Sequence, residues 1–311
     1  MSDVLVVQPI HAEGIALLRR AGLAVHEAQE PVLAAAVRPH LGRAQAVITR
    51  NLGFPAAAIA AAPKLRVIAS HGTGTDAIDR TAAAGRGIVV LNTPGTNARS
   101  VAEHALALML ACARLVPEAD RAVRAGDFGF RDTARPIELA GRTLGLIGYG
   151  HVARLLGGMA RGLGMRVAAV SAHADAAEMA RDGVSPLPDI ERLLAAADVV
   201  SLHAVPGVHP RLDSARLAGM KPGSILVNTA RGALLDTAAL VAALRQGRLR
   251  AAALDVFETE PLAADSPLCC CPRLILSPHV GGSSEEASRR TAVAVALLVI
   301  EALGRPVPQA E

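Results

Sequence analysis

A histidine, a glutamate pair and an arginine could together move a proton and hold a carboxylate. His279 lies in the segment Ser277-Pro278-His279-Val280-Gly281-Gly282, and Glu258 and Glu260 lie about twenty residues upstream. A carboxylate that bonds an imidazole favours the charged imidazole, which a proton donor working near neutral pH requires. Spacing alone does not choose between the two glutamates, and a single histidine is more often structural than catalytic.

Arg231 lies in the segment Val227-Asn228-Thr229-Ala230-Arg231-Gly232. A guanidinium group binds a carboxylate through two parallel hydrogen bonds and can polarise a carbonyl. The alternative for Arg231 is a surface arginine at a helix end. With His279 and one glutamate it would serve acid/base chemistry on a substrate that carries a carboxylate and a carbonyl.

A glycine-rich turn, Gly148-x-Gly150-x-x-Ala153, separates an apolar run from a helical stretch over 151–163. The first glycine allows a tight turn, the second lets a pyrophosphate approach the backbone, and the small alanine allows close helix–strand packing. The helix N-terminus offers N–H groups to the phosphates. The pattern predicts dinucleotide binding, although such turns are common. Periodicity predicts that the inner face of this helix consists of Val152, Leu155, Leu156 and Met159.

Strands and helices alternate along the chain in two series. The first predicts strands over 4–7, 46–49, 66–69 and 88–91, with helices over 12–21 and 55–61. The second predicts strands from 143 and over 166–170, 199–202, 224–228, 251–255 and 274–276, then a helix over 285–303. This alternation predicts an α/β fold with two doubly wound parallel sheets. A long helix from Asn97 to Leu110 is more apolar than one buried stripe requires, so it is buried on most sides or packed against a partner subunit.

Polar residues follow the predicted strands of the second series, where parallel sheets bind ligands. The residues at these strand ends, most of them polar or ionisable, are Gly148, Gly150, Ser171, His203, Thr229, Ala230, Arg231, Asp255 and His279. In the first series, the segment Ser70-His71-Gly72-Thr73-Gly74-Thr75-Asp76 could hold a substrate carboxylate on its N–H groups, or be an ordinary tight turn.

Composition excludes several classes of protein. The 311 residues carry a net charge of +4, but aromatic residues make up 2% and the arginines are scattered, which argues against nucleic-acid binding. Three of the four cysteines are consecutive (Cys269, Cys270 and Cys271), match no zinc pattern and predict reduced thiols without a metal. No apolar run is long enough for a membrane span, and the N-terminus shows no signal peptide, so we expect a cytoplasmic protein.

Seven short motifs follow one another along nearly the whole chain. They are His71-Gly72-Thr73-Gly74-Thr75-Asp76, Asn92-Thr93-Pro94-Gly95, Ser100-Val101-Ala102-Glu103, Gly148-x-Gly150-x-x-Ala153, Asn228-Thr229-Ala230-Arg231-Gly232, Asp255-Val256-Phe257-x-x-Glu260-Pro261 and Pro278-His279-x-Gly281-Gly282. With them the chain resembles the D-isomer-specific 2-hydroxyacid dehydrogenase family, which includes phosphoglycerate, glyoxylate/hydroxypyruvate and D-lactate dehydrogenases.

The resemblance implies roles for individual residues. Arg231 binds the substrate carboxylate and carbonyl, and His279 is the acid/base with Glu260, rather than Glu258, as its partner. Thr73 and Gly74 present N–H groups to the substrate. The implied cofactor-binding residues are Gly148, Gly150, His151, Val152 (with His151 over the pyrophosphate), Ser171, His203, Thr229, Ala230, Asp255 (at the nicotinamide carboxamide), Gly281 and Gly282.

The resemblance also implies the domain organisation. Residues 1–97 and 284–311 form a discontinuous, flavodoxin-like substrate domain, and residues 98–283 form a Rossmann domain that binds NAD or NADP. The long helix near 100–115 helps form a homodimer. The chain ends at Glu311, which predicts that it lacks the regulatory domain of some phosphoglycerate dehydrogenases.

Two positions depart from the family pattern. NAD-dependent members carry an acid where Ser171 stands; without it a 2′-phosphate is not repelled, and Ser171 with His173 could accept one, which slightly favours NADP. Ser70 stands where phosphoglycerate-type members have a basic residue, leaving Arg50 as the remaining phosphate contact. We therefore expect a small unphosphorylated 2-oxo or 2-hydroxy acid, such as glyoxylate or hydroxypyruvate.

Three other functions stay open at this point. One is D-3-phosphoglycerate dehydrogenase, and another is phosphite oxidation with the same three residues. The third is a non-catalytic NAD(H)-sensing binding protein, because relatives of the family serve as transcriptional corepressors on the same scaffold. Formate oxidation is disfavoured, since the members that perform it resemble a longer chain with an amide at position 260.

Overall fold

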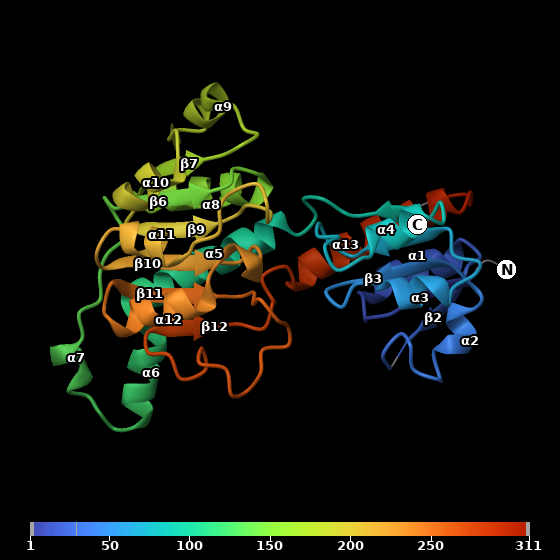
Figure 1. The fold of residues 1–311 in the computed structure, drawn as a ribbon, viewed down its shortest axis with the longest axis horizontal. Helices are drawn as coiled ribbons and strands as arrows, with labels where there is room; N and C mark the ends of the chain where they lie inside the picture. Colours follow the sequence, from blue (N-terminus) through green and yellow to red (C-terminus); the bar gives the residue numbers. More distant parts are fainter. Residues whose placement is uncertain (1–2, 29, 309–311) are drawn as a thin grey trace. The chain divides into compact units, whose positions relative to one another are not determined.

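The computed structural model describes residues 3–28 and 30–308 and contains two compact units. Unit 1 comprises Met1–Asn97 and Gly282–Glu311, and unit 2 comprises Ala98–Gly281 (Figure 1). The predicted domain boundary after residue 283 lies two residues later than the boundary between these units. Gly282 packs closely on Asn97 of unit 1: a Cβ at Gly282 would lie 2.6 Å from the side-chain nitrogen of Asn97.

Unit 1 contains a five-stranded sheet in the order β2-β1-β3-β4-β5, with all pairs parallel. Its strands are β1 (Asp3–Val6), β2 (Ala24–Glu27), β3 (Ala44–Thr49), β4 (Val67–Ser70) and β5 (Val89–Leu91). Its helices are α1 (Ala12–Arg20), α2 (Arg38–Leu41), α3 (Ala56–Ala60), α4 (Arg80–Ala84) and α13 (Glu285–Ala302). This is the strand order of flavodoxin-like folds.

Unit 2 contains a seven-stranded parallel sheet in the order β12-β11-β10-β9-β6-β7-β8. Its strands are β6 (Thr143–Ile147), β7 (Arg166–Val170), β8 (Ser185–Pro186), β9 (Val199–Leu202), β10 (Ser224–Asn228), β11 (Leu249–Leu254) and β12 (Leu274–Leu276). Its helices are α5 (Ala98–Arg114), α6 (Val116–Arg124), α7 (Phe130–Thr133), α8 (His151–Gly162), α9 (Ala176–Arg181), α10 (Ile190–Ala196), α11 (Ser214–Gly219) and α12 (Thr237–Arg245), with a 3₁₀ turn, η1 (Gly232–Leu234). The predicted fold class, α/β with two doubly wound parallel sheets, is confirmed.

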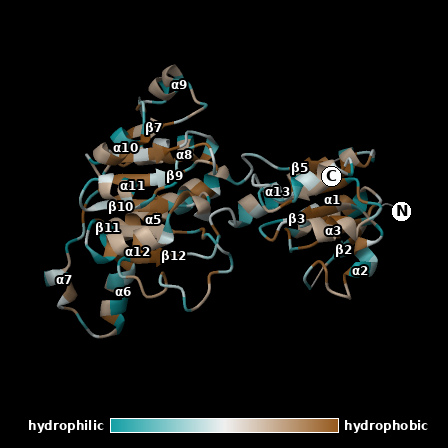
Figure 2. Cartoon of the chain, viewed as in Figure 1, coloured by the Kyte–Doolittle hydropathy of each residue, from teal (hydrophilic) through white to brown (hydrophobic). Residues whose placement is uncertain are grey.

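The inner strands of each sheet are buried because helices cover both faces of the sheet, whereas β2, β5, β8 and β12, at the sheet edges, are not fully buried. Every residue of β9 and β10 is buried, and the strands of both units stand out as hydrophobic (Figure 2). The sequence analysis missed β2 and β8. The first is only partly buried and carries His26 and Glu27, and the second has two residues, so neither shows the apolar run that predicts a strand.

The prediction for the inner face of helix α8 is confirmed for Leu156 and wrong for the other three residues. Ala153, Leu156, Gly157 and Ala160 are its buried residues, whereas Val152, Leu155 and Met159 are partly buried at the margin of the contact. Periodicity favoured the large side chains, but small ones let the helix approach the sheet. A Cβ at Gly157 would lie 3.5 Å from Leu146 and 3.6 Å from Val167.

About half of the residues of helix α5 are buried, and no residue of α6 is buried. The segment with α6 and α7 projects from the body of unit 2 (Figure 1). Among the described residues, no single helix is long and apolar enough to cross a membrane; α5 and α6, bent by 59°, pass that test only as a pair, by length and composition.

Candidate active site

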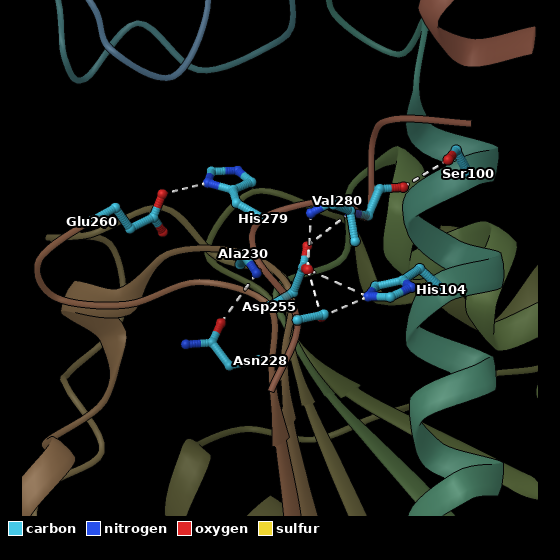
Figure 3. A network of polar contacts seen from close by, with 10 residues as sticks. Ser100, His104, Asn228, Ala230, Asp255, Glu260, His279 and Val280 are labelled. Atoms are coloured by element: carbon cyan, nitrogen blue, oxygen red, sulfur yellow. Dashed lines mark hydrogen bonds and ion pairs between the residues drawn. The ribbon is translucent and has the colours of Figure 1, made fainter. Parts of the chain in front are cut away.

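The carboxyl ends of the unit 2 strands bring an imidazole and a carboxylate into contact. Nδ1 of His279, which follows β12, lies 2.7 Å from Oε2 of Glu260, on the loop after β11 (Figure 3). Both side chains are about one-third exposed, so a ligand can reach the pair. The pair has the composition of a proton-transfer site.

The two candidate glutamates have different partners. The other oxygen of Glu260 accepts the N–H of Phe257 at 3.0 Å. Burial raises the pKa of Glu260, but the bond from His279 and this N–H bring it below its ordinary value. Glu258 pairs with Arg211 and accepts the hydroxyl of Thr237 at 2.5 Å. Only Glu260 of the two therefore contacts the imidazole.

Arg231 follows β10, the neighbour of β11. Asn228 shapes this loop: its amide accepts the N–H of Ala230 at 3.1 Å and donates to the carbonyl of Arg231 at 2.9 Å. The Arg231 guanidinium itself donates to the Ala230 carbonyl at 2.7 Å. A Cβ at Gly232 would lie 2.0 Å from the backbone of Phe257, so this loop packs directly on the loop that carries Glu260.

Asp255 holds the backbone around His279. His279 has a left-handed φ of 55°, which is uncommon for a residue with a side chain. The next two N–H groups, of Val280 and Gly281, donate to the Asp255 carboxylate at 3.0 and 2.8 Å (Figure 3). A Cβ at Gly281 would lie 2.9 Å from the same carboxylate, so the position needs glycine.

Asp255 is 1% exposed, and its carboxylate accepts hydrogen bonds from two segments, the loop after β12 and helix α5. Besides the two N–H groups it accepts the Ser277 hydroxyl at 2.6 Å, and Nε2 of His104 lies 3.3 Å away. Burial raises the pKa of Asp255, but the bonds from His104, Ser277, Gly281 and Val280 together bring it below its ordinary value. The carboxylate is thus a buried, ionised anchor.

The dinucleotide turn has room for a phosphate. Gly148 has a φ of 91° and packs on β9: its Cβ would lie 2.6 Å from the His203 carbonyl. A Cβ at Gly150 would meet nothing within 4 Å, and no side chain caps α8, which begins with His151 and Val152. After β10, two strands from β6 in the sheet, the buried hydroxyl of Thr229 has no hydrogen-bond partner among the described residues. An open glycine cradle at a helix N-terminus and an unsatisfied hydroxyl suit a dinucleotide cofactor.

The loop after β7 carries no acid in place of Ser171. The Ser171 hydroxyl oxygen accepts the N–H groups of His173 and Ala174 at 3.2 and 3.0 Å. His209, which the sequence analysis did not select, lies near enough for the charge of His173 to lower its pKa, after the larger effect of burial. Burial lowers the pKa of His203 to about 4, so its imidazole is neutral; it bonds Ser201 at 2.8 Å.

Unit 1 contains the remaining predicted residues. The carbonyl of Thr73 accepts the Asn92 amide at 2.7 Å, and that of Gly74 accepts the Ser70 hydroxyl at 2.6 Å, so both carbonyls are held inside the loop after β4. The guanidinium of Arg50, after β3, donates to the Pro9 carbonyl at 2.8 Å. Their contacts with a substrate stay predictions.

The sequence analysis missed the residues that support the site. His104 and Ser277 bond Asp255, and Ser100 donates to the Gly281 carbonyl at 2.6 Å. The one available signal was the spacing of Ser100 and His104, which places two polar side chains on one face of an apolar helix.

The described residues contain no group of three metal-binding side chains. Among the consecutive cysteines, Cys269 and Cys270 are exposed and Cys271 is buried, all as free thiols.

Comparison with known proteins identifies the family of this chain. Residues 106–281 match the model of the D-isomer specific 2-hydroxyacid dehydrogenase NAD binding domain. The chain belongs to this family. The resemblance drawn from the seven motifs is thereby confirmed, and the matched residues coincide with most of unit 2, where the glycine turn lies.

The family members most similar to this chain include two kinds of enzyme. A D-3-phosphoglycerate dehydrogenase of Archaeoglobus fulgidus is 38% identical over 99% of this chain and 58% of its own length. A glyoxylate reductase of Korarchaeum cryptofilum is 39% identical over 76% of this chain and 72% of its own. The crystal structure of the TT0316 protein of Thermus thermophilus is 35% identical, covers 99% of both chains and has a TM-score of 0.85.

The chain spans about half the length of the phosphoglycerate dehydrogenases that it matches. Their names therefore describe longer proteins.

Replacing Asp255 by Asn should separate the contributions of its hydrogen bonds and of its charge to the stability of the folded protein. At pH 7 the variant should be about 1–3 kcal/mol less stable, because an amide cannot accept all of the buried donors. The pKa of Asp255 is lowered in the folded state, so its contribution is complete above its ordinary value, near pH 4, and is lost as the pH falls further. Urea unfolding between pH 7 and 2 should therefore show a shallower acid loss in the variant.

The exposed Asp132→Asn variant is the control and should follow the wild type throughout. Equal acid slopes in wild type and Asp255→Asn would show that this carboxylate is not the ionised anchor described above.

Proposed function

We propose that this chain is an NAD(P)H-dependent oxidoreductase of small 2-oxo and 2-hydroxy acids of the glyoxylate and hydroxypyruvate kind. The 2.7 Å contact between His279 and Glu260 carries the proposal, because it orients the imidazole as a proton donor, and the loop with Glu260 packs on the loop with Arg231. Membership of the family and the similarity to a glyoxylate reductase support it.

In the reductive direction, Arg231 would bind the substrate carboxylate and stabilise negative charge that grows on the carbonyl oxygen. His279 would donate a proton to that oxygen from Nε2, because Nδ1 faces Glu260. The nicotinamide, when bound, supplies the hydride that adds to the carbonyl carbon. In the oxidative direction, neutral His279 would accept the hydroxyl proton at the same nitrogen. Glu260 would keep the ring oriented and stabilise its charged form.

The environment of Ser70 supports an unphosphorylated substrate. Its hydroxyl donates to the Gly74 carbonyl and its side chain is buried. This position therefore offers no second positive charge to bind a substrate phosphate. D-3-phosphoglycerate is the second candidate substrate. The phosphoglycerate dehydrogenase relatives favour it, and Arg50 would then contact the phosphate.

Parallel assays of NADH and NADPH oxidation with glyoxylate, hydroxypyruvate, pyruvate and phosphohydroxypyruvate test the proposal. We expect the highest kcat/KM with an unphosphorylated acid, and His279→Ala should lower kcat by about 100-fold or more, since it removes the proton donor. Cofactor binding, measured by fluorescence titration, should change little.

Wild-type turnover by His279→Ala would contradict the proton-donor role. Preference for phosphohydroxypyruvate would select the second substrate, and cofactor binding without turnover of any oxo acid would instead favour an NAD(H)-sensing protein.

We further propose that NADP is the preferred cofactor. No acid occupies position 171 to repel a 2′-phosphate, and the Ser171 hydroxyl is free to donate after accepting two N–H groups. The imidazole of His173, two residues along, and that of His209, whose pKa the charge of His173 lowers, would be further donors.

Replacing Ser171 by Asp should reverse this preference. The carboxylate would bind ribose hydroxyls and repel a 2′-phosphate, so the Kd for NADPH should rise about tenfold or more while that for NADH falls. Equilibrium titration of both cofactors measures the change. Ser171→Ala should weaken NADPH binding without improving NADH binding. Tighter binding of NADH than NADPH by the wild type would overturn the proposal.

The exposed side chains of the projecting segment support a homodimer. Val116, Val123 and Phe128 are 54%, 56% and 69% exposed around a helix with no buried residue, and a second copy of the chain would cover them.

Light scattering after gel filtration should give twice the 31.9 kDa chain mass. Val123→Glu should shift the protein toward the monomer, because it places a charge in the contact. Val307→Glu, at an equally exposed valine of unit 1, is the matched control. A wild-type mass of one chain would exclude the homodimer. The cytoplasmic location remains a prediction from the sequence.

A further inference from the structure

One face of α5 holds both ends of the His279 loop, which we define as Ser277–Gly281. Ser100 and His104 are four residues apart and share this face. The Ser100 hydroxyl donates to the Gly281 carbonyl at 2.6 Å, and Nε2 of His104 lies 2.9 Å from the Ser277 hydroxyl. The loop that carries the proposed proton donor is therefore fixed to a long, half-buried helix.

The hydrogen bonds around Ser277 have a defined direction. Its hydroxyl donates to Oδ1 of Asp255 at 2.6 Å, which uses the hydroxyl proton. The Ser277 oxygen can then only accept, so Nε2 of His104 must be the donor. The same Nε2 lies 3.3 Å from Oδ1 of Asp255 (Figure 3). His104 thus donates into the carboxylate that holds the loop.

The conformation of His279 depends on that carboxylate. A left-handed φ at a residue with a side chain is strained and persists only when its surroundings impose it. Here the N–H groups of Val280 and Gly281 impose it by converging on Asp255. A carboxylate without the His104 donor would be less firmly placed to hold them.

We propose that His104 is a positioning residue for proton transfer at His279, acting through Ser277 and Asp255 on the His279 loop. The catalytic part of this inference rests on the proposed function, whereas its structural part can be measured without any turnover.

Hydrogen–deuterium exchange of the Val280 and Gly281 amides, in the chain without cofactor, tests the structural part. His104→Leu removes the donor while keeping a side chain of similar size, and both amides should exchange about tenfold faster or more. His104→Gln retains an N–H donor and should restore most of the protection. Arg99→Gln, on the same helix at a residue that pairs with Glu103, should exchange like the wild type.

Steady-state kinetics on the best oxo acid test the catalytic part. His104→Leu should lower kcat about 10- to 100-fold, because small misplacements of a reacting group are costly, and leave KM within about twofold. His104→Gln should recover most of kcat. A purely structural role would lower the thermal midpoint of His104→Leu and His104→Gln alike and would not separate kcat from KM.

The outcomes distinguish this inference from the proposed function. Unchanged exchange and kcat in His104→Leu would overturn the role of His104. Faster exchange in a protein whose wild type reduces no oxo acid would keep the structural part and defeat the proposed function. If His104→Leu does not fold, Ser277→Ala removes the same link at the loop, and full protection of both amides in it would overturn the inference.

Discussion

The candidate active site depends on the hydrogen bonds that the buried Asp255 carboxylate accepts. An ionised carboxylate at 1% exposure is stable only when its oxygens receive hydrogen bonds, and here it receives them from the His279 loop and, through Ser277 and His104, from α5. The need to satisfy one charge therefore fixes two segments at once, the His279 loop and α5. The imidazole of His279 then meets Glu260 from a backbone that has little freedom.

The second constraint is the parallel sheet of unit 2, whose strands all end at one edge. Side chains that lie far apart in the sequence follow those ends, so Arg231, Asp255 and His279 come from three neighbouring strands. Small residues complete the arrangement: Gly232 allows the Arg231 loop to lie on the backbone of Phe257, and Gly281 leaves room for the Asp255 carboxylate. The Asp255 carboxylate holds the segments of the site together, and close packing at Gly232 and Gly281 sets the distances between them.

The sequence predicted the fold class, the family and the residues after the strands, because hydrophobic alternation and short motifs are local properties. It placed Leu156 correctly on the buried face of α8 but not Ala153, Gly157 and Ala160, since the small residues that allow close approach look weakly hydrophobic in a periodic pattern. The sequence also could not predict the hydrogen-bond partners of Asp255. His104 lies 151 positions before it in the chain, and only the packing of α5 brings the two together. Likewise, spacing left Glu258 and Glu260 equivalent, whereas Arg211 and Thr237 occupy the first and His279 the second.

The insertion of unit 2 within unit 1 has a consequence for biogenesis. Helix α13 supplies Val295, Ala296, Val299 and Ile300 to the same hydrophobic core as β1 and α1. A ribosome makes these residues only after unit 2, so the part of unit 1 that precedes residue 98 must wait, with an incomplete core, while the whole of unit 2 is synthesised. Unit 2 is continuous and can fold as soon as it emerges. During translation, the nascent N-terminal segment is therefore the part of this chain with the greatest need for a chaperone.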